Sequence, residues 1–307
     1  MIPLEEIRRA RERLGDAVLR SPLVRFDERI WLKLENLQPI GSFKLRGALS
    51  AIRAAGPAEL AGGVVTASAG NMGQGVAWAA RELGLRATIV APDSAPRAKL
   101  DAIERLGGAI VSVPYEVWWQ TMVDRRYEGL DGLFVHPVED ETVMAGNGTI
   151  GLEVCEDLAA FDTVIVPWGG GGLTTGIASA VKALRPDVRV VTAEPETGAP
   201  FAAALAAGGP APIEFQPSFV DGAGGPALLP SMWDRASGLV DEAVAVPLDE
   251  VAEAIRLLAS RTRVVAEGAG ALALAAARRR DDATVCIVSG GNIDAAVLAR
   301  ILTGETP

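Results

Sequence analysis

Lysine is scarce in this chain, and one of its four lysines lies where an amine could react. Lys44 stands in the segment GSFKLRG between Phe43 and Leu45, directly after a Gly-Ser turn and at the start of a predicted helix. An apolar setting and the positive end of a helix both lower the pKa of an amine. An amine with a lowered pKa can form a Schiff base with a carbonyl compound. The other lysines lie in ordinary strand or helix settings: Lys33, Lys99 and Lys182.

A run of glycines, GGGGL at 169–173, is the second chemical feature. It follows a strand-like apolar run and precedes a predicted helix, so its backbone N–H groups and the helix N-terminus can surround a phosphate. Thr174 and Thr175 are not preceded by the lysine that a Walker loop requires. The segment therefore fits a small monophosphate best, although a glycine loop alone is equally typical of an ordinary turn.

Two further polar segments follow predicted strands, SAGNMGQG at 68–75 and SGGNID at 289–294. In an open α/β sheet the loops at the strand ends converge on one crevice, so segments distant in sequence can build one site. The single histidine, His136, excludes a histidine-based triad or metal cluster and is expected to be structural. Acid–base chemistry must then fall to other groups, and Lys44 is the candidate among the side chains of these segments.

The elements that position these segments alternate between short β-branched runs and stretches of helical period. This pattern is typical of an α/β protein with a largely parallel sheet. The predicted strands are 63–67, 87–91, 109–113, 163–167, 188–193 and 284–289. The predicted helices are 73–83, 96–106, 142–158, 174–184, 250–263 and 293–302. The stretch 207–230 shows neither pattern, so it is either an active-site loop or a flexible connection.

Taken together, the segments resemble the fold-type II pyridoxal-phosphate enzymes, and among them the serine/threonine dehydratase and serine racemase group. The resemblance runs from KLENLQPIGSFKLRGA at 33–48 through MAGNGTIGLE at 144–153 to VSGGNID at 288–294. It implies two open, largely parallel sheet domains with an architecture like that of the tryptophan synthase β chain. A large cofactor-binding domain is expected at 1–50 and 143–307, and a small domain for the substrate carboxylate at 51–142.

The resemblance also implies roles for individual residues. Lys44 would carry pyridoxal 5'-phosphate and then remove the substrate's α-proton. Asn71 would bond the phenolic oxygen of the cofactor, the glycine loop its phosphate, and Ser289 would face its pyridine nitrogen. The full cofactor set is Phe43, Lys44, Asn71, Gly169, Gly170, Gly171, Gly172, Leu173 and Ser289. The substrate carboxylate would bind at Ser68, Ala69, Gly70, Asn71 and Met72.

The expected reaction is the dehydration and deamination of a β-hydroxy amino acid, such as L-threonine or L-serine, to a 2-oxo acid and ammonia. A serine hydroxyl cannot keep the pyridine nitrogen protonated as a carboxylate would, so Ser289 favours elimination over transamination. At the position of Ala69 the resemblance implies a serine in the racemases, which delivers a proton to the opposite face of the α-carbon. Alanine cannot donate a proton, so racemisation should be weak. Three alternatives stay open: a serine racemase activity, a β-replacement synthase, and a ligand-binding relative without catalysis.

Several relatives hold a divalent cation with a glutamate, a backbone carbonyl and an aspartate. Glu194 matches the glutamate and Gly198 could supply the carbonyl, but Pro200 stands at the third position. No divalent-metal site is therefore expected, because hard cations need more oxygen ligands. A monovalent-cation site at Glu194 and Gly198 stays open.

Three apolar residues stand at or beside the expected site: Met72, Val138 and Trp168. Met72 replaces the histidine that is usual in the relatives. If these side chains line the pocket, it should prefer threonine or an aryl-substituted serine to serine. The alternative is that all three point into the core.

Composition excludes several classes of partner. The formal net charge of −10 opposes a phosphate backbone, so no nucleic-acid partner is expected. No segment has the apolar length of a membrane span and the first residues lack a secretory stretch, so we expect no membrane partner and a cytoplasmic location. Cys155 and Cys286 lie far apart in predicted core segments, so no disulfide is expected. The resemblance implies a small amino-acid substrate and a homodimer or homotetramer.

Overall fold

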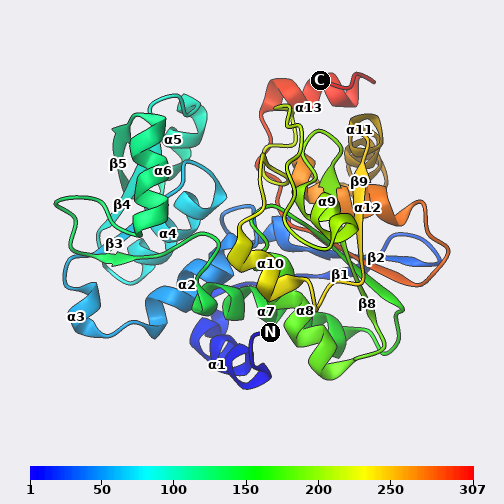
Figure 1. The fold of residues 1–307 in the computed structure, drawn as a ribbon, viewed down its shortest axis with the longest axis horizontal. Helices are drawn as coiled ribbons and strands as arrows, with labels where there is room; N and C mark the ends of the chain where they lie inside the picture. Colours follow the sequence, from blue (N-terminus) through cyan, green and yellow to red (C-terminus); the bar gives the residue numbers. More distant parts are fainter.

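Two separate sheets, each covered by helices, make up the structure, a computed structural model that describes residues 1–307 (Figure 1). The six-stranded sheet has the order β1-β2-β10-β7-β8-β9, and the four-stranded sheet has the order β5-β4-β3-β6. All neighbouring strands run parallel except β1 and β2. This architecture has the predicted α/β class with two largely parallel sheets.

The strand bounds agree well with the sequence periodicity. The six-stranded sheet holds β1 (Leu23–Arg25), β2 (Ile30–Leu34), β7 (Thr163–Pro167), β8 (Arg189–Pro195), β9 (Glu242–Val246) and β10 (Thr284–Val288). The four-stranded sheet holds β3 (Val64–Ala67), β4 (Ala87–Pro92), β5 (Gly108–Val113) and β6 (Leu133–Phe134). The six predicted strands match β3, β4, β5, β7, β8 and β10, and the strand-like stretch around Lys33 is β2. β1 and β6 are too short to show a period, and β9 is a half-exposed edge strand.

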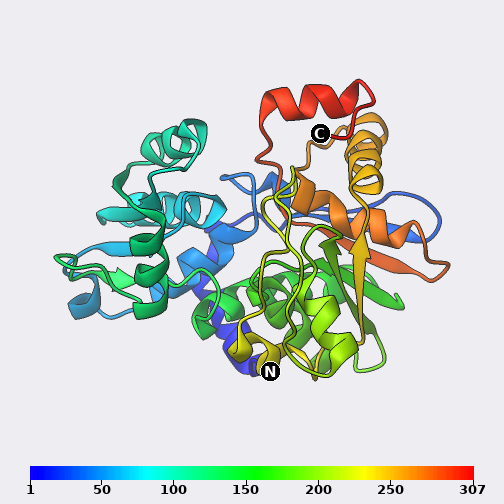
Figure 2. The same ribbon diagram turned by 45° about the horizontal axis from the view of Figure 1, so that its top comes forward.

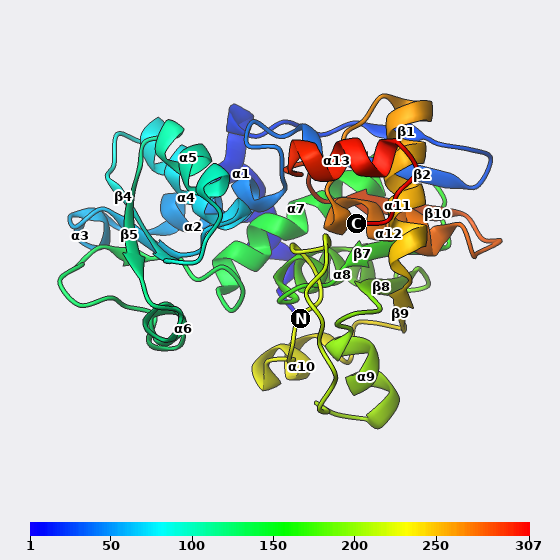
Figure 3. The same cartoon turned by 90° about the horizontal axis from the view of Figure 1, so that it is seen from above.

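The four-stranded sheet is covered on both faces. Its helices are α3 (Pro57–Leu60), α4 (Asn71–Glu82), α5 (Arg97–Arg105) and α6 (Tyr115–Asp124). Successive strand residues point to opposite faces. Val64 therefore packs in the cluster with α4, whereas the next residue, Val65, packs in the cluster that includes α6. Figure 3 shows α6 apart from α4 and α5 at this end of the molecule.

The six-stranded sheet is also covered on both faces. One face packs on α1 (Leu4–Leu14), α7 (Glu141–Asp157) and α8 (Gly172–Leu184), and the other on α11 (Leu248–Leu257), α12 (Gly268–Ala277) and α13 (Ala295–Leu302). In Figure 2 the red α13 lies above this sheet and the dark-blue α1 below it. Two short helices, α9 (Pro200–Ala207) and α10 (Pro230–Ala236), also pack in the cluster on the first face.

Six helices match the predicted ranges: α4, α5, α7, α8, α11 and α13. The prediction for 250–263 combines α11 with a π-helical turn at Leu258–Thr262. The sequence pattern does not predict α12, because every one of its residues is buried and the helix has no polar face to create a period.

The helix that begins at Lys44, α2 (Lys44–Ala54), connects the two sheets because it packs against both α4 and α7. Glycines allow this close approach. A Cβ on Gly75 of α4 would lie 3.2 Å from the carbonyl oxygen of Lys44, and one on Gly146 of α7 would lie 2.5 Å from that of Arg46. The start of α2 is therefore fixed between backbone segments from both halves of the molecule.

A buried network of charges lies directly behind the start of α2. Arg46 bonds Glu35 at 2.8 Å and Glu153 at 2.6 Å, and the Nζ of Lys33 lies 2.5 Å from Oε2 of Glu153. The two adjacent carboxylates raise the pKa of Arg46, which burial alone would lower. These side chains are almost completely inaccessible to solvent, so each charge depends on its partners.

Residues 208–229 form neither helix nor strand, as their composition indicates. Cys155 and Cys286 are both free and buried, in agreement with the expectation of no disulfide. None of the helices combines the length and the apolar character that crossing a bilayer requires.

Candidate active site

One cavity brings together three of the four segments that the sequence singles out. Its lining consists of Phe43, Lys44, Pro137, Val138, Pro167, Gly169, Gly170, Gly171, Gly172, Leu173, Gly222 and Ser289. Lys44, the glycine loop and Ser289 come from α2, from the loop after β7 and from the end of β10. The carboxyl ends of parallel strands thus converge here, as the crevice rule for open α/β sheets requires.

Lys44 points its amine at this cavity. Its Nζ donates a hydrogen bond to the carbonyl oxygen of Pro137 at 3.2 Å and lies 5.2 Å from the centre of the Phe43 ring. Burial lowers the pKa of Lys44 to about 8, although the nearby carboxyl of Glu267 acts in the opposite direction. A fraction of the amine is therefore unprotonated near neutral pH and available as a nucleophile or base.

The glycine loop connects β7 to the N-terminus of α8, and it has no room for side chains. A Cβ on Gly170 would lie 2.4 Å from Cγ2 of Val138. Gly171 has a φ of +93°, and a Cβ there would lie 2.5 Å from Cη2 of Trp168. The loop therefore presents backbone N–H groups and a helix N-terminus to the cavity, which is the donor set that a phosphate group needs. The residues present fit the predicted cofactor.

Backbone hydrogen bonds hold the lysine segment against the SGGNID segment. The N–H of Gly291 donates to the carbonyl oxygen of Gly41 at 2.9 Å, and Ser42 and Gly290 form an antiparallel bridge. Ser289 itself is buried at the end of β10. The positions of Lys44 and Ser289 are therefore coupled through the main chain.

The fourth segment, SAGNMGQG, opens onto a neighbouring cavity that shares Gly222 with the first. This second cavity is lined by Gly70, Asn71, Gln74, Lys99, Asp221, Gly222, Glu267 and Asn292, none of them hydrophobic. Asn71 is the first residue of α4, and Gly70 precedes it. Ser68, Ala69 and Met72 line neither cavity, and the side chain of Met72 is 1% exposed in the core.

Three charged residues of this second cavity are not among the site residues that the sequence predicts. Glu267 comes from the start of α12, Lys99 from α5, and Asp221 from the irregular segment. The Nζ of Lys99 lies 2.5 Å from Oδ2 of Asp221, which joins the two halves across the cavity. Burial, reinforced by the charge of Asp221, raises the pKa of Glu267 to about 7. A signal for Glu267 does exist, because it is the only acid in the apolar stretch VVAEGAGALAL.

The irregular segment 207–230 contributes directly to the site. Asp221 and Gly222 line the cavities, and the N–H of Gly224 donates to the carbonyl oxygen of Trp168 at 2.7 Å. This placement fits the first of the two alternatives for the segment, an active-site loop.

Two of the three apolar residues do not shape the pocket, which corrects the basis for expecting a bulky substrate. Trp168 is fully buried and stacks on Phe201 with ring centres 4.0 Å apart. Met72 also belongs to the core, whereas Val138 does line the cavity. Sequence spacing alone could not show that the side chains of Trp168 and Met72 point into the core.

His136 supports the loop that carries Pro137 and Val138. Its Nδ1 accepts hydrogen bonds from the N–H groups of Val138 at 3.1 Å and Glu139 at 2.8 Å. Burial, reinforced by the charge of Arg125, lowers the pKa of His136 to about 4. The neutral ring acts as an acceptor and has the structural role that the sequence indicates.

Glu194 is buried and accepts hydrogen bonds from the N–H groups of Phe201 at 3.0 Å and Ala202 at 2.8 Å. Its carboxylate thus caps the start of α9. The monovalent-cation site at Glu194 and Gly198 stays a prediction.

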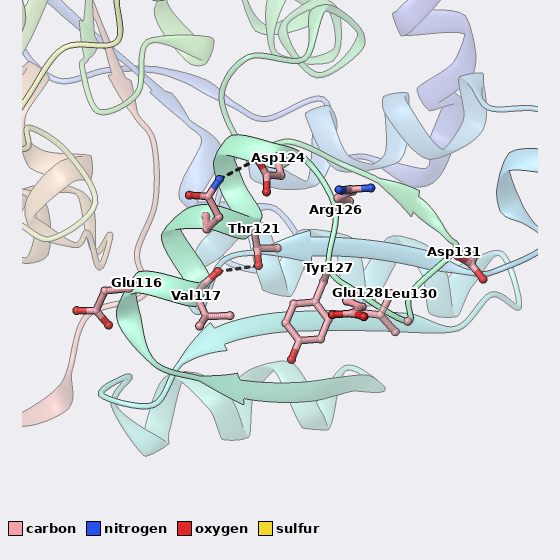
Figure 4. A pocket seen from close by; sticks show the side chains of 11 residues that line it. Glu116, Val117, Thr121, Asp124, Arg126, Tyr127, Glu128, Leu130 and Asp131 are labelled. Atoms are coloured by element: carbon pink, nitrogen blue, oxygen red, sulfur yellow. Dashed lines mark hydrogen bonds between the residues drawn. The ribbon is translucent and has the colours of Figure 1, made fainter.

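A larger hollow of about 900 Å³ lies elsewhere, beside α6 (Figure 4). Its charged lining residues are Glu116, Asp124, Arg126, Glu128 and Asp131. None of the predicted site residues lies there, and it contains no lysine. The chemistry therefore belongs to the smaller cavities between the sheets.

Comparison with known proteins identifies the family. The model of the family "Pyridoxal-phosphate dependent enzyme" matches residues 15–290. The chain is 39% identical to the L-threonine ammonia-lyase of Thermotoga maritima, over 98% of this chain and 78% of that protein. It is 36% identical to the catabolic L-threonine dehydratase of Escherichia coli strain K12, over 98% of this chain and 96% of that protein.

Solved structures agree with this assignment. Maize serine racemase has a TM-score of 0.88 at 30% identity, with 98% of this chain and 96% of that chain covered. The serine racemase of Dictyostelium discoideum has a TM-score of 0.86 at 30% identity, with 95% of this chain and 99% of that chain covered. A threonine deaminase has a TM-score of 0.85 at 34% identity, with 95% and 98% covered. The predicted family, fold class and cofactor are confirmed. The chain belongs to the pyridoxal-phosphate dependent enzymes of fold type II.

Proposed function

We propose that the protein catalyses the α,β-elimination of a β-hydroxy amino acid, such as L-threonine or L-serine, to a 2-oxo acid and ammonia. The observation that carries this proposal is the single cavity lined by Lys44, the glycine loop and Ser289. The names of the relatives, a threonine ammonia-lyase and a threonine dehydratase, support the same reaction class.

The bound cofactor supplies an electron-withdrawing ring that acidifies the substrate's α-carbon. The residues of this chain divide the remaining work. Lys44 would hold the cofactor through its Nζ. Once the substrate's amino group has replaced Lys44 on the cofactor, the freed Nζ would take the α-proton, because burial keeps part of the free amine unprotonated. The N–H groups of the glycine loop bind the phosphate, and Ser289 offers the pyridine nitrogen a neutral hydroxyl. Phe43 and Leu173 close the apolar sides of the cavity.

We place the substrate carboxylate at the N-terminus of α4, where Gly70 and Asn71 line the polar cavity and the backbone N–H groups of 69–72 are the candidate donors. The helix dipole favours an anion there. The hydroxyl of Ser68 accepts a hydrogen bond from the N–H of Gly70 at 3.3 Å and keeps its own proton for a ligand. We assign this half of the site to a small domain of 51–142 and the cofactor to a large domain of 1–50 and 143–307. The lysine helix α2 lies between them and contacts both.

A panel of substrates tests the reaction. Purified enzyme should release ammonia and 2-oxo acid from L-threonine and L-serine, with L-threo-phenylserine as a probe of pocket size. Only Val138 of the three apolar residues lines the cavity, so a strong preference for phenylserine is not expected. Absence of 2-oxo acid from every substrate, or formation of D-isomer faster than 2-oxo acid, would overturn the proposal.

We infer a cytoplasmic location and a homodimer or homotetramer. Both cysteines are free thiols, which is typical of a reducing compartment. The net charge of −10 argues against nucleic acid as a partner. Light scattering of the purified holoenzyme measures the oligomeric state, and a monomer would contradict the inference.

A further inference from the structure

Glu267 is a buried carboxyl group in the site to which the proposed reaction assigns no role. It lies immediately before the first residue of α12, is 6% exposed, and lines the polar cavity beside Asn71. Its Oε1 accepts a hydrogen bond from Nδ2 of Asn71 at 2.9 Å.

A chain of hydrogen bonds fixes which way the Asn71 amide faces. The carbonyl oxygen of Ile40 can only accept, so the group that contacts it at 2.9 Å must be the Nδ2 of Asn292. The same Nδ2 donates to Oδ1 of Asn71 at 2.8 Å. Asn71 must therefore turn its Nδ2 toward Glu267. One N–H of Asn71 is used by this carboxyl, and no acceptor of the protein takes the second.

The fold leaves a close-fitting space for this carboxyl group. A Cβ on Gly290 would lie 2.3 Å from Oε1 of Glu267, and a Cβ on Gly222 would lie 3.5 Å from it. Gly290 belongs to the same SGGNID segment as Asn292. This segment therefore positions Glu267 and Asn71 together.

Charged groups surround Glu267 from three directions. Lys44 lies on α2, Lys99 on α5 and Asp221 on the active-site loop, and α12 itself adds no further charge within its helix. Arg105 at the end of α5 and Asp294 before α13 line the adjoining hollow together with Glu267. The charge of Glu267 raises the pKa of Lys44, while burial and Asp221 raise the pKa of Glu267 itself to about 7. The carboxyl thus changes its charge near neutral pH, where the amine of Lys44 is also partly unprotonated.

We propose that Glu267 is a positioning residue, which holds Asn71 with its free N–H turned toward the cofactor and sets the charge of the site beside Lys44. This inference rests on the proposed function, because it takes Lys44 and Asn71 as cofactor contacts. In this proposal, protonation of Glu267 changes the electrostatic field at the cofactor, although Glu267 does not contact the substrate.

The test is a pH titration of the visible absorption of the holoenzyme without substrate. Because burial raises the pKa of Glu267 to about 7, wild-type enzyme should show a spectral transition in this range. Glu267→Gln keeps the shape and a hydrogen-bond acceptor but cannot titrate, so this transition should disappear while the cofactor stays bound. Glu267→Ala also releases Asn71, and cofactor retention should fall by roughly 10-fold or more.

A matched control is available. Burial also raises the pKa of Glu194 to about 7, but its carboxyl caps α9 away from the cavities. Glu194→Gln should therefore keep the transition. A transition that is absent from the wild type, persists in Glu267→Gln, or is lost in Glu194→Gln overturns the inference. A wild-type protein without a chromophore trapped on Lys44 would instead show that the proposed function has failed.

Discussion

The backbone N–H of Phe43 donates a hydrogen bond to the carbonyl oxygen of Ser289, 3.0 Å away. The residue before Lys44 is thereby tied to the last residue before the Gly-Gly turn that follows β10. Because the main chain makes this contact, the side chain of Lys44 can be removed without releasing the two segments. Function and fold can therefore be separated by substitution at this position.

We expect Lys44→Ala to abolish both turnover and the covalent link to the cofactor while the far-ultraviolet circular dichroism stays unchanged. Borohydride reduction of wild-type holoenzyme, followed by peptide mass spectrometry, should find the cofactor on Lys44. Lys182→Ala is the control, because its amine bonds Asp241 and the carbonyl oxygen of Val188 far from the cavity. A cofactor trapped on any other lysine would refute the assignment.

Gly171→Ala should weaken both folding and cofactor binding. The backbone has a φ of +93° there, and the new Cβ would lie 2.5 Å from Trp168. Gly208→Ala is a matched control, because its φ is +77° but nothing lies within 4 Å of a Cβ. The control should lose about 1–2 kcal/mol from the positive φ alone. Urea unfolding and cofactor titration should show a larger loss of stability and affinity for Gly171→Ala than for Gly208→Ala. Equal losses would mean that the loop can accommodate a methyl group.

Ala69→Ser should raise the ratio of racemisation to elimination. The wild-type methyl group cannot deliver a proton to the opposite face of the α-carbon, whereas a hydroxyl can. Chiral chromatography of the amino acid left after partial conversion of L-serine measures the change. Ser68→Ala is a useful comparison, because it removes the neighbouring hydroxyl and should reduce substrate affinity instead. An unchanged ratio in Ala69→Ser would show that position 69 does not face the α-carbon.

Glu153→Gln should destabilise the fold strongly. The carboxylate pairs with Lys33 and Arg46, both at most 1% exposed, so the change leaves two buried cations with too few partners. Breaking such a network typically costs about 3–5 kcal/mol. Glu5→Gln removes a carboxylate that is 61% exposed on α1, and it should change the free energy of unfolding by less than about 1 kcal/mol. Urea unfolding of the two variants measures both changes in the free energy of unfolding, and equal changes would contradict the prediction.

Acid should loosen the loop at His136 before it unfolds the protein. The pKa of His136 is about 4 in the folded protein and 6.5 in the unfolded chain. Between pH 4 and pH 6.5 the unfolded state therefore binds more protons than the folded state. The stability that the neutral ring contributes is therefore present above pH 6.5 and is lost as the pH falls toward 4. His136→Asn, which keeps an acceptor but does not titrate, should lose less stability over this range. Parallel curves for the two proteins would contradict the prediction.

Much of this organisation could be predicted because it rests on local patterns. The β-branched strands, the glycine loop and Lys44 each carry their signal within a few residues. The contacts of Glu267 could not be predicted, because Asn71 is almost two hundred positions away and only the fold brings them together. Sequence position alone places Met72 and Trp168 near the site, but the direction of a side chain depends on packing that no local pattern encodes.

The reactivity of the two buried thiols can report local and global opening of the fold. Burial raises the pKa of Cys155 to about 11 and that of Cys286 still further, so neither reacts readily as a thiolate in the native state. Cys155 lies near the end of α7, beside α1 and α8, whereas Cys286 lies in the central strand β10. If Cys155 is alkylated before Cys286, the helical layer opens locally while the sheet stays folded. If both are alkylated at the same rate, the whole chain unfolds cooperatively.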